Sequence, residues 1–246
     1  MPRITPEQLR LRKKAPVLVF DGDDTLWFTM PLYRRAKEQF FMIMQLQGFD
    51  RGSVEEFFEN LDAKNVRRLG FSGRRFSVSM LATYRTFCNN TGRRTDRAVE
   101  IKIRRTASQV FDRKPLLAPF ATQTLNRLQK RYHLFLLTKG ERKVQNKRLD
   151  SSGLRRFFRR VIIVPDKNFA VFKLVSKRYK LVPHNTWSIG NSLKSDINPA
   201  LRAGFSAIWI PYQTWRYEEG VQLRKWKPIK AQSLREVPRI INAKRG

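Results

Sequence analysis

The stretch VLVF at residues 17–20, followed by DGDDT at 21–25, decides the fold. Four consecutive apolar residues without alternation are typical of a strand that is buried on both faces of a parallel sheet. The polar residues and the glycine that follow indicate a loop. The sequence therefore predicts a buried parallel strand that presents Asp21 and Asp23 at its carboxyl end.

After Pro115 the sequence alternates between strand and helix patterns. Such alternation predicts an α/β, Rossmann-like three-layer core, in which helices cover both faces of a parallel sheet. We expect the tail, 211–246, to pack on this core through Trp215 and Trp226 and to end in a helix near 234–241. The predicted strands are 133–137, 161–164, 187–189 and, as the last one, 207–210; the predicted helices are 121–132, 141–153, 167–179 and 198–203.

The segment 28–115 has a different pattern, because it contains helical periodicity and no strong strand. Apolar residues recur at helical spacing, and glycine-, serine- and asparagine-rich turns at 70–73 and 89–92 separate the helices. The sequence therefore predicts two parts: a core made of 1–27 and 116–246, including the C-terminal tail, and an all-helical insertion, 28–115. The clearest helices of the insertion are predicted at 33–46, 54–69 and 98–111.

The composition excludes several classes of protein. The 246 residues include 12% aromatic residues, which suffice for a substantial core, and no apolar run reaches the roughly 18 residues of a membrane span. A single cysteine, Cys88, forms no internal disulfide, and no cysteine–histidine cluster would hold structural zinc. The basic start has no hydrophobic stretch typical of a secretory signal. We expect a cytoplasmic protein, and an organellar location stays open because the start is basic.

The net charge of +31, with an isoelectric point near 11.3, is unusual. A field this positive attracts polyanions and favours nonspecific binding of nucleic acid. High arginine usage without a partner is the alternative interpretation. No zinc finger, aromatic RNA-binding run or strong helix-turn-helix pattern accompanies the charge. Residues 21–27 form the only locally acidic stretch.

Polar side chains follow four of the predicted strands: Asp21 and Asp23, then Thr138, then Lys167, and finally the segment 191–196. Because the carboxyl ends of parallel strands meet at one edge of a sheet, we expect these groups to lie together. Neighbouring carboxylates favour Mg²⁺, which binds one or two carboxylates together with substrate phosphate. A hydroxyl group and an ammonium group supply the charge stabilisation that a phosphoryl group needs.

These residues resemble the motifs of the haloacid dehalogenase-like superfamily. DGDDT, 21–25, is similar to its first motif, Asp-x-Asp-x-Thr, and LFLLTKG, 134–140, is similar to its second. Lys167 lies at about the usual distance before the fourth motif, which WSIGNSLKSDINPALRAG, 187–204, resembles. The resemblance covers 17–27 and 121–210, and it implies that the helical insertion is a cap between the first and second motifs.

The resemblance implies a role for each matching residue. Asp21 corresponds to the nucleophile that attacks phosphorus and forms an aspartyl-phosphate. Asp23 corresponds to the general acid for the leaving oxygen and then the base for water, and its presence favours phosphoryl transfer over dehalogenation. Thr138 and Lys167 correspond to the residues that hold the transferring phosphoryl group.

The resemblance also implies a Mg²⁺ site formed by Asp21, the backbone carbonyl of Asp23, and Asn191 and Asp196 of the fourth motif. That motif commonly reads Gly-Asp-Ser, whereas this chain has Asn191 in the middle position. The amide still offers a carbonyl oxygen to the metal, but the site loses one negative charge.

Simpler structural roles compete with some of these assignments. Thr138 is also suited to capping the helix that follows it, and Asp196 to capping the short helix at 198–203. Lys173, six residues after Lys167 in the same predicted helix, is a rival for the phosphate-binding role. Phe157 and Phe158, although flanked by arginines, are expected to belong to the core.

The sequence thus predicts a Mg²⁺-dependent phosphohydrolase that cleaves a phosphate monoester through an aspartyl-phosphate. The expected partner is a phosphorylated substrate, either a nucleotide or nucleic-acid phosphate or a small metabolite phosphate, with nucleic acid or another polyanion as a further partner. The alternative is a basic nucleic-acid-binding or structural subunit of a nucleoprotein particle that keeps the same fold. The sequence does not indicate an oligomeric state.

Overall fold

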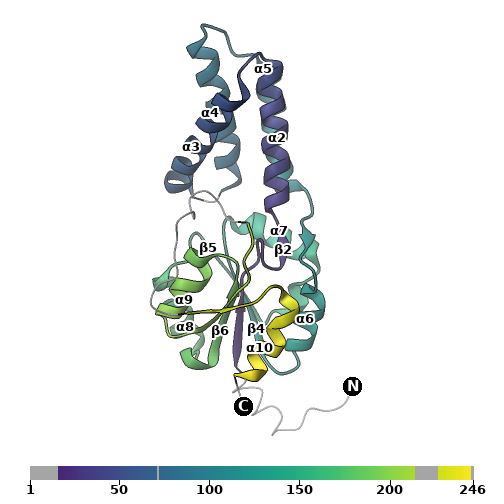
Figure 1. Ribbon diagram of the computed structural model, residues 1–246, viewed down its shortest axis with the longest axis vertical. Helices are drawn as coiled ribbons and strands as arrows, with labels where there is room; N and C mark the ends of the chain where they lie inside the picture. The colour runs from purple at the N-terminus through teal and green to yellow at the C-terminus, as the bar shows by residue number, and fades with distance from the viewer. Residues whose placement is uncertain (1–15, 71, 214–226, 245–246) are drawn as a thin grey trace.

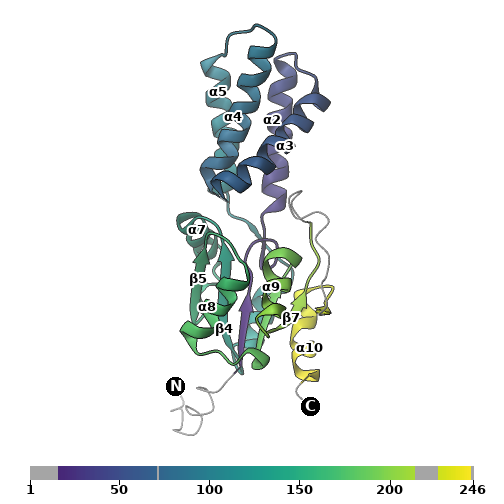
Figure 2. The same cartoon turned by 90° about the vertical axis from the view of Figure 1, so that its left-hand side faces the viewer.

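The computed structural model describes residues 16–70, 72–213 and 227–244. They form an elongated molecule in which a bundle of four helices stands on a core built around a sheet (Figure 1, Figure 2). The sheet has six strands in the order β5-β4-β1-β6-β7-β8, and every pairing is parallel. The strands are β1 (Val17–Phe20), β4 (His133–Lys139), β5 (Arg160–Val164), β6 (Thr186–Gly190), β7 (Ser206–Trp209) and β8 (Ile229–Lys230).

Strand β1 lies at the centre of the sheet, and its position fixes the site. Phe20, its last residue, is in register with Leu136 of β4 and Ile189 of β6. The residues that follow β1 and β6, and those that end β4, therefore reach the same edge of the sheet. This arrangement confirms the predicted fold class and brings the strand-end residues to one place.

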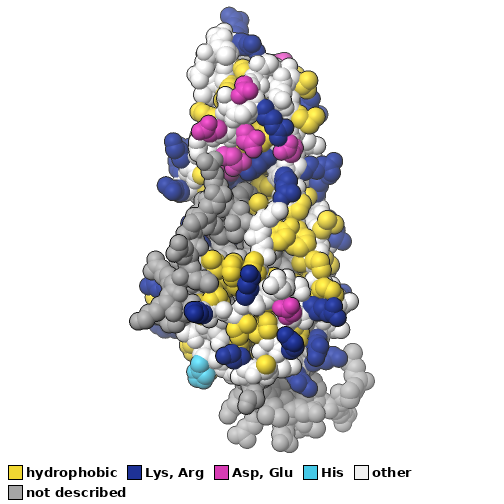
Figure 3. Space-filling view, viewed as in Figure 1, with side chains coloured by type: hydrophobic (Ala, Val, Ile, Leu, Met, Phe, Trp, Pro, Cys, Tyr) yellow, Lys and Arg dark blue, Asp and Glu magenta, His cyan; other side chains and the backbone are white. Residues whose placement is uncertain are grey.

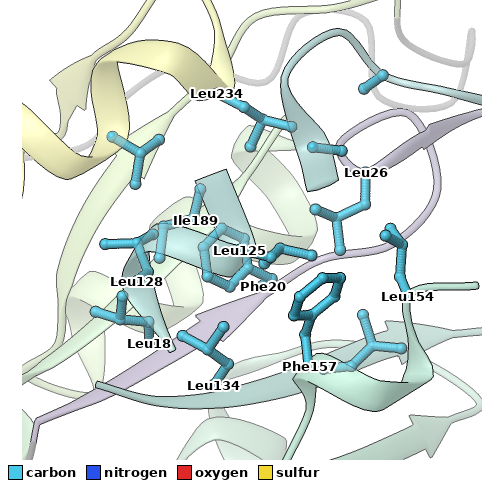
Figure 4. Close-up of a cluster of buried hydrophobic side chains, with 14 of the residues drawn as sticks. Leu18, Phe20, Leu26, Leu125, Leu128, Leu134, Leu154, Phe157, Ile189 and Leu234 are labelled. Carbon is cyan, nitrogen blue, oxygen red and sulfur yellow. The ribbon is translucent and has the colours of Figure 1, made fainter. Parts of the chain in front are cut away.

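Helices cover both faces of the sheet, as the two-residue period of a strand requires. One face carries Leu18 and Phe20, which pack against α6 (Ala121–Leu128) and α10 (Val237–Ala243), as Figure 4 shows. Val17 and Val19 face the other way, into a cluster that includes residues of α8 (Phe169–Tyr179) and α9 (Asn198–Arg202). Phe157 and Phe158 pack in the first cluster, which confirms that they belong to the core.

The four helices between residues 30 and 112 have a hydrophobic cluster of their own, separate from the two clusters of the sheet. It contains phenylalanines that contact one another edge to face, such as Phe41 with Phe58 and Phe58 with Phe76. A short antiparallel ribbon of β2 (Trp27–Phe28) and β3 (Leu116–Leu117) joins this bundle to the core. The helices are α2 (Met30–Leu46), α3 (Arg51–Leu69), α4 (Gly73–Asn90) and α5 (Arg97–Asp112).

Some predicted boundaries are wrong. The strand predicted as the last, at 207–210, is followed by β8, which pairs with β7 and forms the edge of the sheet. The helix predicted at 121–132 ends at Leu128, and a π-helical turn, η3 (Leu193–Ile197), precedes α9. The helix expected near 234–241 is present as η5 (Leu234–Glu236) and α10. Trp215, Trp226 and the basic start lie outside the described residues.

Helix α7 (Arg142–Ser152) follows β4 and lies at the same edge of the sheet as the base of the bundle (Figure 1). It ends at Gly153, whose φ of 71° is the left-handed conformation that commonly ends a helix. Within the described residues, none of the helices has both the length and the apolar character that crossing a membrane demands.

Candidate active site

Asp21 occupies the first position after β1, where burial and a second carboxylate surround it. Only 6% of the residue is exposed, and its Oδ1 accepts a hydrogen bond from the ammonium of Lys167. The same ammonium donates to Oδ1 of Asp196. Burial and the nearby charge of Asp196 raise the pKa of Asp21 to about 7, against the opposing effect of Lys167. Two carboxylates thus share one ammonium group.

Lys167 is the fixed positive charge of the site. Its Nζ donates to Asp21, to Asp196 and, at 3.3 Å, to the backbone carbonyl of Leu137. Burial alone would lower the pKa of Lys167, but the charges of Asp196 and Asp21 outweigh it and raise the pKa. The lysine therefore stays protonated between the two carboxylates.

The position of Lys167 differs in one respect from the prediction. It precedes Asn168, the N-cap of α8, and so lies in the loop after β5 instead of in the first turn of the helix. Lys173 is exposed and lies over the ring of Phe169, 5.4 Å from its centroid, so it is not at the site. Of the two lysines, Lys167 lines the pocket and Lys173 does not.

Thr25 connects the first and fourth motifs. Its Oγ1 lies 3.1 Å from Oδ2 of Asp21 and 3.2 Å from Oδ1 of Asn191, both buried contacts. The backbone carbonyl of Asn191 in turn accepts a hydrogen bond of 2.9 Å from Nε1 of Trp209. These contacts place the amide oxygen of Asn191 beside the carboxylate of Asp21.

The carboxylate of Asp23 accepts three hydrogen bonds, two of them from helix α7. Nε1 of Trp27 donates to Oδ1 at 2.7 Å, while Nε2 of Gln145 and Nη1 of Arg148 donate to Oδ2 at 2.9 and 2.6 Å. The Arg148 side chain is only 5% exposed, and its Nη2 has no hydrogen-bond partner among the described residues. Gln145 and Arg148 also line the site and were not among the residues predicted from the sequence.

Asp24, the third aspartate of the loop, holds the first helix of the bundle. Its φ of 61° turns the carboxylate toward the start of α2, where it accepts from the backbone N–H groups of Thr29 and Met30 at 2.8 and 3.0 Å. Burial raises the pKa of Asp24 to about 6, against those hydrogen bonds. Asp24 is therefore a structural residue that couples the loop to the bundle.

Thr138 presents a hydroxyl group that no described residue satisfies. The residue is 1% exposed, lies within β4 and lines the pocket beside Asp21. The alternative role as a helix cap is wrong, because Glu141 is the N-cap residue of α7. A buried unpaired hydroxyl costs free energy, so this group is suited to a ligand in the pocket. Gly22 lies close by, and a Cβ there would come within 2.6 Å of the Trp27 ring.

The fourth motif turns back on the end of β6 through Asp196. Its Oδ2 accepts from the backbone N–H of Ser192 at 3.0 Å, and any Cβ on Gly190 would collide with its carboxylate. The alternative that Asp196 caps α9 is wrong, because Ile197 is the N-cap residue and has no capping side chain. Lys139 closes this side of the site, since its Nζ donates to Oγ of Ser195 at 2.8 Å.

All six predicted site residues line one pocket of about 60 Å³ at the carboxyl edge of the sheet: Asp21, Asp23, Thr138, Lys167, Asn191 and Asp196. Among the described residues, no three histidine, cysteine or acidic side chains are grouped as a metal site. The oxygens of Asp21, Asp196 and Asn191 nevertheless suit Mg²⁺, which keeps several waters and needs few protein carboxylates. The carboxylate of Asp23 is directed toward Arg148, so a backbone carbonyl is what that residue has left for a metal.

The parallel sheet, the helical bundle above it and the aspartate-lined pocket between them define a Rossmann-like α/β protein with a helical cap over its site. The chain belongs to the haloacid dehalogenase-like hydrolase family, whose sequence model matches residues 16–204. This finding confirms the resemblance carried by the motifs.

Known proteins share the fold over nearly the whole chain. A haloacid dehalogenase-like family hydrolase from Xanthomonas campestris is 23% identical with a TM-score of 0.78, covering 93% of this chain and 95% of that one. The structure of YfnB from Bacillus subtilis, which is bound to magnesium, is 21% identical with a TM-score of 0.63, covering 93% of this chain and 99% of that one. In sequence, YfnB is 31% identical over 96 residues, 37% of this chain, and this chain spans 41% of that relative.

Similar structures include both reaction types of the family. The L-2-haloacid dehalogenase from Xanthobacter autotrophicus has a TM-score of 0.61 at 13% identity, covering 93% of this chain and 98% of that one. A phosphatase is among the similar structures as well. At these identities the likeness establishes the fold, and the choice of reaction rests on the residues of the site.

Proposed function

We propose that this chain is a Mg²⁺-dependent phosphohydrolase that cleaves a phosphate monoester through an aspartyl-phosphate on Asp21. The observation that carries the proposal is the arrangement around Asp21: Lys167 on one oxygen, Thr25 on the other, and the unpaired hydroxyl of Thr138 in the same pocket. A transferring phosphoryl group needs a nucleophile, a fixed cation and directed hydrogen-bond donors. Together these residues supply all three.

In the first step, a carboxylate oxygen of Asp21 forms a bond to phosphorus while the bond from phosphorus to the leaving oxygen breaks. Lys167 and Thr138 hold the phosphoryl oxygens, because an ammonium and a free hydroxyl are donors of hydrogen bonds. The leaving oxygen takes a proton from Asp23. Water then attacks phosphorus as Asp23 accepts a proton from it, and Asp21 is released with inorganic phosphate.

Asp23 must exchange one of its hydrogen bonds to act in this way. Its two oxygens accept from Trp27, Gln145 and Arg148, an arrangement suited to an ionised carboxylate, which only accepts. To act as the acid, Asp23 must leave these donors and take up a proton from solvent, and the protonated oxygen must then turn from α7 toward the substrate. Arg148 and Gln145 thus position the residue between turnovers.

Magnesium, held by oxygens of Asp21, Asp196 and Asn191, would supply positive charge to the transferring phosphoryl group. The site is crowded with negative charge, since two buried carboxylates share Lys167. A divalent cation with its bound waters would neutralise this excess negative charge. Replacement of the common aspartate by Asn191 leaves one negative charge fewer, so we expect weaker metal binding than a third carboxylate would give.

The test is phosphate release from a panel of small phosphate esters, pyrophosphate, nucleotides and terminally phosphorylated oligonucleotides, with and without Mg²⁺. Asp21→Asn is assayed beside the wild type at two salt concentrations. We expect turnover that requires Mg²⁺ and disappears in the variant. No turnover on any ester, together with salt-sensitive oligonucleotide binding by both proteins, would contradict the proposal and favour a binding subunit that keeps the fold.

A further inference from the structure

A second cavity adjoins the active-site pocket, between the helical bundle and helix α7. It holds about 360 Å³, whereas the pocket around Asp21 holds about 60 Å³. The two share Phe111, Glu141 and Val144 as lining residues. We call the larger one the cap groove. The pocket suits a phosphoryl group, and the remainder of a larger substrate finds space next to it in the cap groove.

The walls of the cap groove are basic on balance, because four basic side chains line it beside the two acidic ones, Asp112 and Glu141. Arg74 and Arg104 come from the bundle, and Lys143 and Lys147 come from α7. Lys147 pairs with Asp112 at 2.9 Å, and Glu100, 3.9 Å from Arg104, is also bound by Arg85. Arg74 and Lys143 are exposed and form no ion pair with another described residue. Two cationic side chains of the groove are therefore available to an anion.

Helix α7 connects the groove to the site because its residues alternate between them. Lys143 and Lys147, four positions apart, line the groove, while Gln145 and Arg148, three apart, line the pocket. Lys143 lies in the first turn, where the helix N-terminus adds partial positive charge. Arg148 places a buried guanidinium in the wall of the pocket, where it binds Asp23 and contacts Tyr33. This helix thus offers donors to anions on both sides.

We propose that the cap groove binds a further phosphate on the leaving-group side of the substrate, and that the substrate class is the phosphorylated end of a nucleic-acid chain. The proposal rests on the proposed hydrolysis of a phosphate monoester. In a nucleic acid, a phosphodiester follows the terminal ester, and Arg74 and Lys143 are suited to its negative charge. Phe111, partly buried in the wall, is an aromatic surface of the kind on which bases stack.

The charge of the whole chain supports a long anion over a short one. Lysine and arginine side chains are spread over both the bundle and the core, whereas the acidic side chains visible on the face in Figure 3 gather mainly on the bundle. Because the protein carries a net charge of +31, a chain of phosphates is attracted to its surface beyond the groove as well. A small bisphosphate would reach only the pocket and the groove, and would gain nothing from the charge beyond them.

The experiment compares kcat/KM for a short oligonucleotide with a terminal phosphate with kcat/KM for p-nitrophenyl phosphate, and reports their ratio. Arg74→Gln/Lys143→Gln removes two charges from the groove. Arg127→Gln/Lys130→Gln removes two exposed charges at and just beyond the end of α6, outside the groove. We expect the groove variant to lower the ratio about tenfold and the salt dependence of oligonucleotide binding by about one unit of log–log slope per contact. The control should change the ratio less than about twofold.

Three results would overturn the proposal: equal losses in both double variants, a wild-type ratio no higher for the oligonucleotide than for a nucleoside monophosphate, or a preference for small bisphosphates. If the wild type hydrolyses no ester, the proposed function fails. The groove is then tested alone, by fluorescence anisotropy of a labelled oligonucleotide with a terminal phosphate. Weaker binding by the groove variant than by the control variant supports a phosphate-binding groove, and equal binding rejects it.

Discussion

Both parts of the molecule bury charged side chains, but in different arrangements. In the bundle, Arg75 of α4 pairs with Asp62 of α3, with side chains 1% and 6% exposed. In the core, Lys167 lies between Asp21 and Asp196, with side chains 2%, 7% and 3% exposed. The bundle matches one cation with one anion, whereas the core leaves a negative charge in excess.

The two clusters also differ in whether they border a cavity. Neither Arg75 nor Asp62 lines the pocket or the cap groove. The core cluster lines a pocket, and the unpaired hydroxyl of Thr138 lies in the same pocket. Burial and pairing of charge alone therefore do not mark a catalytic site. Excess negative charge and space for a ligand distinguish the core cluster from the structural pair.

The largest expected effect comes from removing the excess carboxylate. Asp21→Asn should lower phosphate release by about three orders of magnitude or more, because an amide is a poor nucleophile. The variant should unfold at the same or a higher urea concentration than the wild type, because it relieves repulsion from Asp196. Phosphate release and urea denaturation measured on one preparation check both statements. Full activity of Asp21→Asn, or failure of this variant to fold, would contradict the view that the core cluster is catalytic and the bundle pair structural.

Removing one member of the bundle pair should act on stability. Asp62→Ala leaves Arg75 buried without its carboxylate and should lower the free energy of unfolding by about 3–5 kcal/mol. The double variant Arg75→Met/Asp62→Leu should recover most of that loss, since apolar residues replace the whole pair. Thermal and urea denaturation measure the effect. A loss below about 1 kcal/mol in the single variant would mean that this pair does little for folding.

Thr138 should show the opposite pattern from a structural threonine. Thr138→Val removes an unpaired buried hydroxyl, so the stability should hold or rise, while kcat/KM should fall about a hundredfold as a donor to the phosphoryl group is lost.

The matched control for Thr138→Val is Thr124→Val. Thr124 is also buried, and its Oγ1 donates to the carbonyl of Leu234 at 3.0 Å. That variant should lose about 1 kcal/mol of stability and keep its activity. Denaturation and steady-state kinetics of both proteins would separate the two roles, and the same pattern in both variants would contradict the account.

The smallest effect is expected at Arg148, which positions Asp23. Arg148→Met should lower kcat/KM about tenfold, because Asp23 loses a charged donor, and Arg148→Lys should restore part of it. Arg155→Met, which breaks the exposed pair with Asp150, should change kinetics little. Equal kinetics of the Arg148 and Arg155 variants would show that the contact with Asp23 is unimportant.

The sequence predicted the central fold well because its signals are local. An unbroken apolar run at 17–20 and polar residues directly after the strands are enough to predict a parallel sheet with a functional site at its carboxyl edge. The strand β8 was missed because two residues, Ile229 and Lys230, carry no periodicity. Its pairing with β7 is a tertiary contact that a local pattern does not report.

The residues missed at the site have the same explanation. Arg148 and Gln145 lie in a helix rich in basic residues, and nothing local distinguishes a buried arginine from its exposed neighbours. One signal was available: Gln145 and Arg148 are three positions apart, on one face of a helix that follows the second motif. The sequence alone does not distinguish the structural Asp24 from Asp21 and Asp23, because all three are aspartates of one loop. The direction of the Asp24 carboxylate depends on the positive φ of that residue.

The covalent intermediate proposed on Asp21 can be trapped and located directly. The wild type is mixed with a good substrate and Mg²⁺, quenched in acid within one turnover, digested and examined by mass spectrometry. We expect a phosphoryl group on the peptide that contains Asp21, and none when Asp21→Asn is treated in the same way. Phosphate release without a labelled peptide, or with the label on another residue, would contradict this expectation.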